Sequence, residues 1–404
     1  PGPDAVKLAL LTFGACLATT ATAQSDWLTA GDGMLYGYGK HSVLREDSIL
    51  NPGNRLAHLP ERSAVGELRL NLKAESETVR LTARAIATWQ NRADSAATQQ
   101  SDDAYLSQWQ IRLRATEGWH VAAGRDVLSW GPGQFRSPSN PFYFDNGRRN
   151  PMRELVGMDS AKISWTPDMQ SSASLVHIFN TGHSTSQPDA WRAGWLAKFG
   201  RRGNDWTLGL IALKAPDTAA FYGAYGQNTL SDALLLYGEL GSSTQPVALQ
   251  SPADLSQPFT IQTNSPRRTT ALLGAAYTFE NSQSLSVEYL HDGHGYTAAQ
   301  ENSYFQRAIT QPGIALGQAP RLLGRDYLHL VWQSNLMAET GYWRLMFSRN
   351  LNDHGNELAS YGETVLSPQI SAYALAVLPQ GNARQEFSAL VRRSLTLGLK
   401  IALP

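Results

Sequence analysis

The 404-residue sequence has no long apolar run, a single cysteine and no net charge. No apolar stretch approaches the ~18 residues of a membrane-spanning helix, which excludes a helical membrane protein. The 34 basic residues balance 34 acidic ones, so the charge gives no reason to expect nucleic acid. Ordinary apolar content excludes disorder. Charged residues make up only 17% of the chain, against ~25% in an average domain. This composition leaves a large soluble β protein or a membrane β-barrel.

The single cysteine, Cys16, lies in an N-terminal segment with the features of a secretory signal peptide. A lysine precedes the largely apolar residues 8–18, and the Ala-Thr-Ala of residues 21–23 is a small-residue cleavage site. We expect residues 1–23 to be a signal peptide, with acylation of Cys16 as the alternative. The remaining chain, residues 24–404, then has no disulfide, thiolate metal ligand or cysteine nucleophile. Export without disulfides favours a Gram-negative envelope protein.

Alternation of apolar and polar residues with period two is the dominant pattern after this segment. Leu68, Leu70 and Leu72 alternate with polar neighbours, and similar rows occupy residues 269–279 and 395–403. Aromatic residues tend to stand at the ends of the rows, as in the aromatic girdles of a membrane barrel. A soluble β-sandwich is the alternative, although sandwiches seldom run to ~380 residues without domain breaks.

We place about sixteen antiparallel strands, with fourteen to eighteen possible, and the connections between them sort by length. Those that follow even-numbered strands are short, and the long ones follow odd-numbered strands, near residues 128–158, 215–268 and 292–324. Bacterial outer-membrane barrels have short periplasmic turns and long outer loops. The sequence therefore predicts an all-β fold, a transmembrane antiparallel β-barrel over residues 24–404 in the Gram-negative outer membrane, with outer-membrane lipid and lipopolysaccharide around it.

The last predicted strand ends in the alternating residues 396–403. This segment resembles the terminal signal that the barrel-assembly machinery recognises, although the chain ends in Leu403-Pro404 rather than in an aromatic residue. The resemblance implies the assembly machinery as a partner.

If the apolar rows face lipid, the residues between them face the lumen. This places six basic residues of the early strands inside: Arg69, Lys73, Arg80, Arg84, Arg112 and Arg114. Lys162, Arg192 and Lys198 follow further round. A basic lumen favours anions, because low-dielectric walls focus the field on the passage. In the alternative, these arginines pair with acids on inserted loops and pack the interior.

The segment 124–159 combines several glycines and prolines with five arginines. Glycine and proline fix special backbone angles, so this segment predicts a rigid loop at a strand end. It could fold inward and narrow the pore, or form a solvated outer loop held by Arg–Asp pairs. The candidate solute-binding residues here are Arg125, Arg136, Arg148, Arg149 and Arg153.

The same segment resembles known outer-membrane proteins. Gly124-Arg125-Asp126 through Trp130-Gly131 is similar to the strand end of alginate-export-type channels and related proteobacterial barrels. Trp130-Gly131-Pro132-Gly133 with Ser139-Asn140 also resembles Wzi-type capsule-assembly barrels, which bind surface polysaccharide. The resemblance covers about 40 of the 404 residues. It implies a barrel that handles an acidic polysaccharide, with that polymer or an envelope export complex as partner.

Catalytic and metal-binding motifs are missing from the sequence. The loops around His291-Asp292-Gly293-His294 and residues 352–357 are better explained as polar turns than as cation sites. We therefore expect no enzyme activity, no metal and no cofactor. The predicted function is a channel for a hydrophilic anionic or saccharide solute, by exopolysaccharide export or porin-like diffusion. A closed barrel that binds surface polysaccharide is the first alternative, and an outer-membrane enzyme the second.

Overall fold

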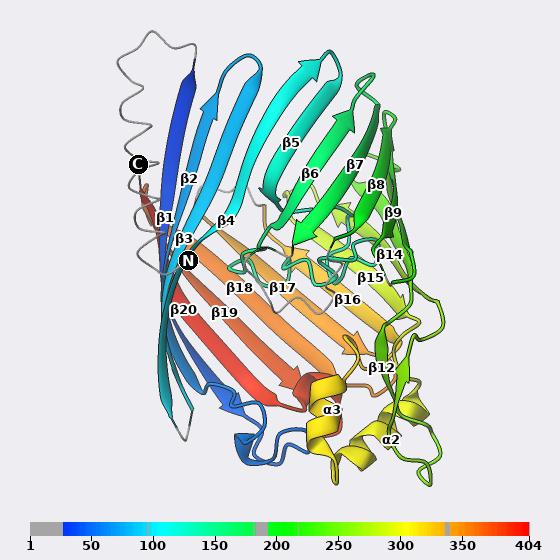
Figure 1. Ribbon diagram of the computed structural model, residues 1–404. Helices are drawn as coiled ribbons and strands as arrows, with labels where there is room; N and C mark the ends of the chain where they lie inside the picture. The colour runs from blue at the N-terminus through cyan, green and yellow to red at the C-terminus, as the bar shows by residue number, and fades with distance from the viewer. Residues whose placement is uncertain are drawn as a thin grey trace.

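The computed structural model describes residues 27–94, 97–180, 182, 193–216, 218–335 and 340–403, so the predicted signal peptide lies outside the described residues. The chain forms a closed antiparallel β-barrel whose wall has 18 strands (Figure 1). These strands are β1 (Leu28–Leu44), β2 (Arg62–Glu75), β3 (Val79–Ala93), β4 (Thr98–Thr116), β5 (Trp119–Asp126), β6 (Met158–Trp165), β7 (Ser171–Asn180), β8 (Trp195–Arg202), β9 (Trp206–Lys214), β10 (Phe221–Thr229), β11 (Leu234–Ser243), β14 (Arg268–Thr278), β15 (Ser284–Asp292), β16 (Asp326–Gln333), β17 (Gly341–Asn350), β18 (Asn356–Ser367), β19 (Ile370–Gln380) and β20 (Val391–Leu403).

The barrel closes where the first strand pairs with the last. β1 is hydrogen-bonded to β2 on one side and to β20 on the other, from Gly33 opposite Leu403 to Leu44 opposite Val391. A closed wall leaves no free strand edge. It also satisfies the backbone polar groups of every strand, which the hydrocarbon core of a membrane requires.

The two ends of the barrel differ in the length of their connections. Short turns such as residues 76–78 and 117–118 lie at one end, which we call the short-turn end. Long connections over residues 45–61, 127–157 and 293–325 lie at the other, which we call the outer end. This is the arrangement of outer-membrane barrels. It agrees with the short connections predicted after even-numbered strands and the long ones predicted after odd-numbered strands.

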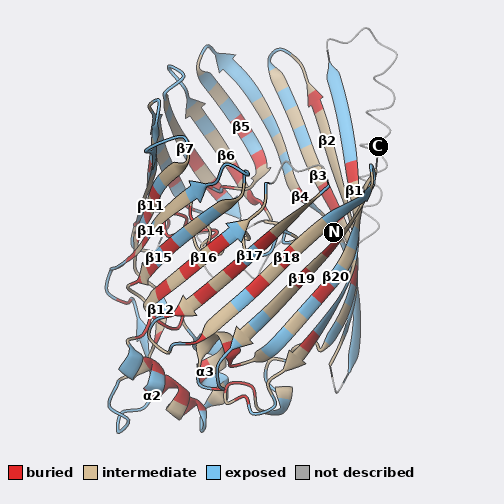
Figure 2. Cartoon of the chain, turned by 180° about the vertical axis from the view of Figure 1, so that it is seen from behind, coloured by how far each residue is buried: buried red, intermediate tan, exposed pale blue. Residues whose placement is uncertain are grey.

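Exposed and covered residues alternate along the strands (Figure 2). Many of the exposed ones are large and apolar, so the outer surface is apolar between the two ends of the barrel. Leu395 and Leu397 of β20 are 45% and 55% exposed, whereas Thr396 between them is 8% exposed. At the short-turn end Trp119 stacks on Trp165, with ring centroids 5.9 Å apart. This is an aromatic belt of the kind found at a membrane–water interface.

The sequence located sixteen of the 18 strands. It missed β10, and it placed the residues of β11 in the longest connection, where residues 232–240 could form a further strand or a helix. The prediction of one loop over residues 215–268 is therefore wrong, because residues 221–243 form two wall strands paired with β9 and β14. The first inward side chains of β11 are apolar: Leu235 and Tyr237 pack inside the barrel, and only Glu239 and Ser243 further along the strand are polar. Its outward residues, such as Leu236 and Leu240, are apolar too. The alternation of apolar and polar residues that marks a strand is therefore weak in β11.

The outer connections form a folded cap over one side of the outer end (Figure 1). It contains α2 (Ala298–Ala308), α3 (Pro312–Gln318), the hairpin of β12 (Val247–Gln250) and β13 (Thr260–Thr263), and the short helices η2 (Pro52–Asn54) and η3 (Glu386–Ser388). A capping box from Thr297 and Gln300 starts α2. The buried core of the cap draws residues from four connections: Leu50, Leu249, Tyr296, Tyr304, Phe305, Ala308, Ala315, Leu323 and Ala389. None of the described helices is long and apolar enough to span a membrane.

Candidate functional site

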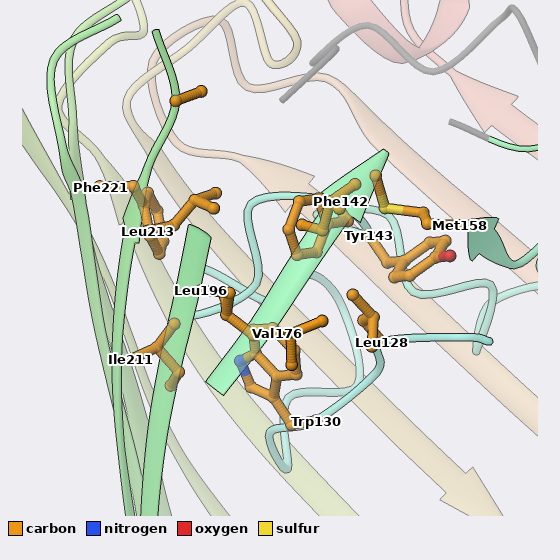
Figure 3. Close-up of a cluster of buried hydrophobic side chains, with 12 residues drawn as sticks. Leu128, Trp130, Phe142, Tyr143, Met158, Val176, Leu196, Ile211, Leu213 and Phe221 are labelled. Atoms are coloured by element: carbon orange, nitrogen blue, oxygen red, sulfur yellow. The ribbon is translucent and has the colours of Figure 1, made fainter. Parts of the chain in front are cut away.

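Residues 127–157 connect β5 to β6 and fold into the interior of the barrel; we call them the inward loop (Figure 1). Leu128, Trp130, Phe142 and Tyr143 of this loop are buried. Figure 3 shows them against apolar side chains of the wall. The wall residues of this cluster are Met158, Val176, Ile178, Leu196, Ile211, Leu213, Ala215 and Phe221. Burial of apolar surface therefore fixes the loop to the inner face of β6–β10.

The inner face of β7–β9 is mainly apolar where the inward loop covers it, although Lys198 of β8 also points inward and lies 5.0 Å from the centroid of the Trp130 ring. Val176, Leu196 and Ile211 point inward and are at most 4% exposed. The expectation that polar residues face the lumen is therefore wrong for most of this sector, with Lys198 as the exception; Arg192 lies outside the described residues. It holds on β2–β4, where Arg69, Arg84 and Gln108 point inward to the loop.

Glu239 of β11 binds the backbone of the inward loop from the wall. Its Oε1 accepts a hydrogen bond from the Gly133 amide at 2.7 Å. Its Oε2 accepts from the hydroxyls of Ser137 and Ser139 at 2.7 and 2.6 Å, and from the Ser139 amide at 3.2 Å. The carboxylate is 1% exposed, and hydrogen bonds to a charged acceptor are the strong ones.

Glu288 of β15 provides a second carboxylate attachment next to the first. It accepts from the amides of Gln134 and Phe135 at 2.6 and 2.7 Å, and from the Tyr237 hydroxyl at 2.7 Å. Burying a carboxylate is costly unless donors surround it, and here the loop supplies backbone donors. The segment 133–139 is thus fixed to β11 and β15.

The opposite side of the inward loop is attached to β2 and β3 through Glu154. Its carboxylate pairs with Arg84 at 2.6 Å and with Arg69 at 3.1 Å. Arg69 also donates to the Met152 carbonyl at 2.9 Å. The loop therefore spans the interior, from β2 and β3 to β11 and β15.

Three of the predicted loop arginines stabilise the inward loop itself. Arg148 donates to the carbonyls of Pro132 and Gly133 at 2.6 and 2.8 Å. Arg149 pairs with Glu357 of β18, and burial together with the neighbouring Arg136 lowers the pKa of Arg149 to about 9.

Arg136 lies over the ring of Phe135, with the guanidinium carbon 4.5 Å from the ring centroid. Arg344 of β17 donates to the Arg148 carbonyl at 2.9 Å. These contacts account for Arg136, Arg148 and Arg149 structurally, and their role in solute binding stays a prediction.

Arg125 lies outside the lumen, contrary to the sequence prediction. It stands opposite Trp109 of β4, whose side chain is on the exposed outer face, and paired residues of neighbouring strands share a face. Arg125 forms a salt bridge with Asp159 at 2.7 Å. The sequence predicted a strand over residues 119–127 here, but it grouped Arg125 with the arginines of the segment 124–159 and did not follow the alternation of that strand, β5.

Arg153 pairs with Asp145 of the same loop at 2.6 Å, and both side chains are 45% exposed. The sequence analysis expected Arg–Asp pairs of this kind if the segment formed a solvated outer loop. Burial opposes ionisation of Asp145, but the nearby Arg136 and Arg153 outweigh it and lower its pKa.

The remaining predicted arginines lie on the inner face of β3 and β4. Arg80 pairs with Glu75 through its Nε at 2.9 Å. Arg112 and Arg114 follow on β4, and Arg114 stands opposite His120 of β5. In the part of the chain that the structure describes, neither forms a salt bridge. The short-turn side of the lumen therefore carries uncompensated basic charge.

A cavity of about 450 Å³ lies at the outer end, between the inward loop, the end of β11 and the connection from β15 to β16. Pro138 and Asn140 of the inward loop line it, and its charged residues include Arg268, Arg321 and Arg325. Asp292 is the one carboxylate among its described lining residues. We call this cavity the outer vestibule. The sequence could not locate it, because its walls come from segments far apart in the chain.

The vestibule also contains a serine and a histidine, which bears on the enzyme alternative. Ser243 Oγ lies 3.3 Å from His294 Nε2, and burial lowers the pKa of His294 although Asp292 opposes this. Asp292 accepts from Thr270 and from the His294 backbone amide. Those bonds do not orient the imidazole as a triad requires. Among the described residues no group of three or more His, Cys, Asp or Glu could hold a metal ion.

Solved structures show where this fold occurs. Pseudomonas aeruginosa OccK11 (OpdR) is 12% identical, with 93% of this chain and 96% of that chain covered and a TM-score of 0.57. Pseudomonas aeruginosa OprD is 10% identical, with 93% and 95% covered and a TM-score of 0.54. No family model and no curated protein matches the sequence. At this identity the likeness shows the fold alone, a large closed antiparallel β-barrel, and the outer-membrane location predicted from the sequence agrees with it.

Proposed function

We propose that this protein is a porin-like channel of the outer membrane for small hydrophilic solutes, with a preference for anions. The observation that carries the proposal is the asymmetry of the lumen. The inward loop covers the apolar sector of β6–β10, while the wall of β2–β5 keeps polar and basic side chains. A solute would pass along this basic wall, beside the loop.

Such a solute would meet two groups of arginines, one after the other, on its way through the barrel. The vestibule presents Arg268, Arg321 and Arg325 at the outer end, and Arg112 and Arg114 lie further in on β4. Guanidinium groups bind carboxylates and phosphates by paired hydrogen bonds. Conduction requires sites that attract the solute and yet release it, which partly exposed arginines provide.

Ion selectivity in a planar bilayer tests this function. We expect an open current that prefers anions, measured as the reversal potential in a KCl gradient. The double variant Arg112→Gln/Arg114→Gln should shift the reversal potential toward cations, because it removes two lumen charges. Arg201→Gln is the matched control, since Arg201 stands opposite the outward-facing Leu208. Unchanged selectivity in the double variant would contradict the proposal.

A closed barrel that holds surface polysaccharide is the second candidate function. The buried core of the outer cap and the attachment of the inward loop to both sides of the wall favour it. In that case reconstituted protein gives no current and still binds an acidic polysaccharide in a pull-down. Export of such a polymer, which the resemblance to alginate-export-type channels implies, instead requires current that acidic oligosaccharides block.

A further inference from the structure

The outer face of β20, β1 and β2 carries three basic residues near the outer end of the barrel. His41 of β1 stands opposite Leu395 of β20 and opposite Arg62 of β2. Leu395 is on the exposed apolar face, so all three point outward, as paired residues share a face. Arg393 lies two residues before Leu395 in β20 and points the same way. Arg62, His41 and Arg393 are all exposed.

The two arginines of this group have no acidic partner within the described residues. Asp47, in the loop that follows β1, pairs instead with Arg45 at 3.5 Å and with Arg392 at 3.3 Å. Arg392 is the extra residue of a β-bulge in β20, opposite Val43 and Leu44, and Asp47 compensates its charge. Two guanidinium groups therefore face outward without compensation.

A strip of outer wall without large side chains runs from the basic group toward the middle of the membrane. Gly39 stands opposite Ala64, and Gly37 stands opposite Gly66. A side chain added at Gly37 would meet nothing within 4 Å. Leucines of β20 border the strip on one side.

Trp89 of β3 borders the strip on the other side, opposite Gly66, and is 53% exposed. Tryptophans of this kind mark the membrane–water interface. Trp89 therefore places the Gly37–Gly66 end of the strip at the boundary with the acyl chains. The basic group lies further toward the outer end, at the depth of lipid headgroups.

We propose that this surface binds a phosphorylated glycolipid of the outer leaflet, with its phosphates at Arg62 and Arg393 and one acyl chain along the glycine strip. Arginine is the residue best suited to phosphate recognition. The Cα atoms of the two arginines are two strands and two residues apart, roughly 12 Å. That separation is similar to the length of a disaccharide with a phosphate at each end. A phospholipid has one phosphate and would engage one arginine only.

Native mass spectrometry of the detergent-purified barrel, without divalent cations, tests the site. The probe is hexa-acylated, bisphosphorylated lipid A, with dephosphorylated lipid A and phosphatidylglycerol as comparisons. We expect Arg62→Gln/Arg393→Gln to weaken lipid A binding about 30-fold, since each arginine near a charged membrane surface contributes roughly fivefold. Arg201→Gln, an outward arginine at the short-turn end, should bind like the parent protein.

A second variant separates the acyl strip from the charges. Gly37→Leu fills the strip without changing charge, and we expect at least a several-fold loss of lipid A adducts. Equal binding by the double arginine variant and the parent overturns the proposal, as does phosphatidylglycerol binding as tightly as lipid A. Neither variant changes a lumen residue, so channel current should stay as in the parent, and this site can fail without the proposed channel function failing.

Discussion

Replacing Glu239 by glutamine perturbs the docking of the inward loop without touching the pairing of the barrel wall. The carboxylate accepts through Oε1 from the Gly133 amide and through Oε2 from two serine side chains and the Ser139 amide. A carboxamide keeps one acceptor oxygen and replaces the other by an NH₂ donor. The serine hydroxyls can rotate to accept from it, but one backbone amide, of Gly133 or Ser139, loses its partner.

The size of the effect follows from the burial of that amide. A buried donor without an acceptor costs roughly 1–3 kcal/mol, and hydrogen bonds to a charged group exceed those to a neutral one. We therefore expect loop docking to weaken by roughly 2–3 kcal/mol, which is about a 30- to 150-fold increase in loop opening. β11 remains paired with β10 and β14 along its length, so the wall should keep its stability.

Hydrogen exchange measured by mass spectrometry checks this prediction. Amides of residues 131–139 should exchange faster by that factor, while those of the wall strands keep the rates of the parent protein. Glu75→Gln is a matched control, because Glu75 pairs with Lys73 and Arg80 at the short-turn end. Unchanged exchange at residues 131–139 would refute the view that Glu239 holds the loop.

Further predictions concern the inward loop and the outer cap. Trp130→Ala should weaken loop docking by roughly 3–5 kcal/mol, seen as faster exchange of the same amides, because Trp130 is buried and bonded to the Ser139 carbonyl. Glu154→Gln frees two wall arginines from a carboxylate and should move the reversal potential toward anions. Burial together with two nearby carboxylates raises the pKa of Glu301 to about 10 from 4.5. The folded cap therefore favours the protonated form, and its stability should fall as pH rises between these values, by at most ~1.4 kcal/mol per pH unit. Glu301→Gln should remove this slope in exchange of the α2 amides.

Much of the wall was predictable from the sequence because strand alternation is a local property. Rows such as Leu395, Leu397 and Leu399 require only that one face meets lipid and the other does not. The alternation disappears where both faces are apolar, as around Leu235 and Tyr237 of β11. Those strands were missed because the residues that cover their inner face come from the inward loop.

The contacts of the site were beyond prediction because they join distant parts of the chain. Glu239 and Gly133 are 106 residues apart, and Glu288 and Gln134 are 154 apart. Such pairs depend on the register of every strand between them. The sequence could place arginines in the segment 124–159, but only the register shows that Arg125 faces outward while Arg148 turns back onto its own loop.

The attachment of the inward loop to Glu239 and Glu288 has a consequence for the order of assembly. The loop is separated in the chain by 106 residues from Glu239 and by 154 from Glu288, so its docking needs strands that lie far from it in the sequence. Until β11 and β15 are in place, the amides of residues 133–139 have no carboxylates to bind. Docking of the loop therefore requires both strands, and the interior of the barrel has to stay open to the loop until β11 and β15 have joined the wall.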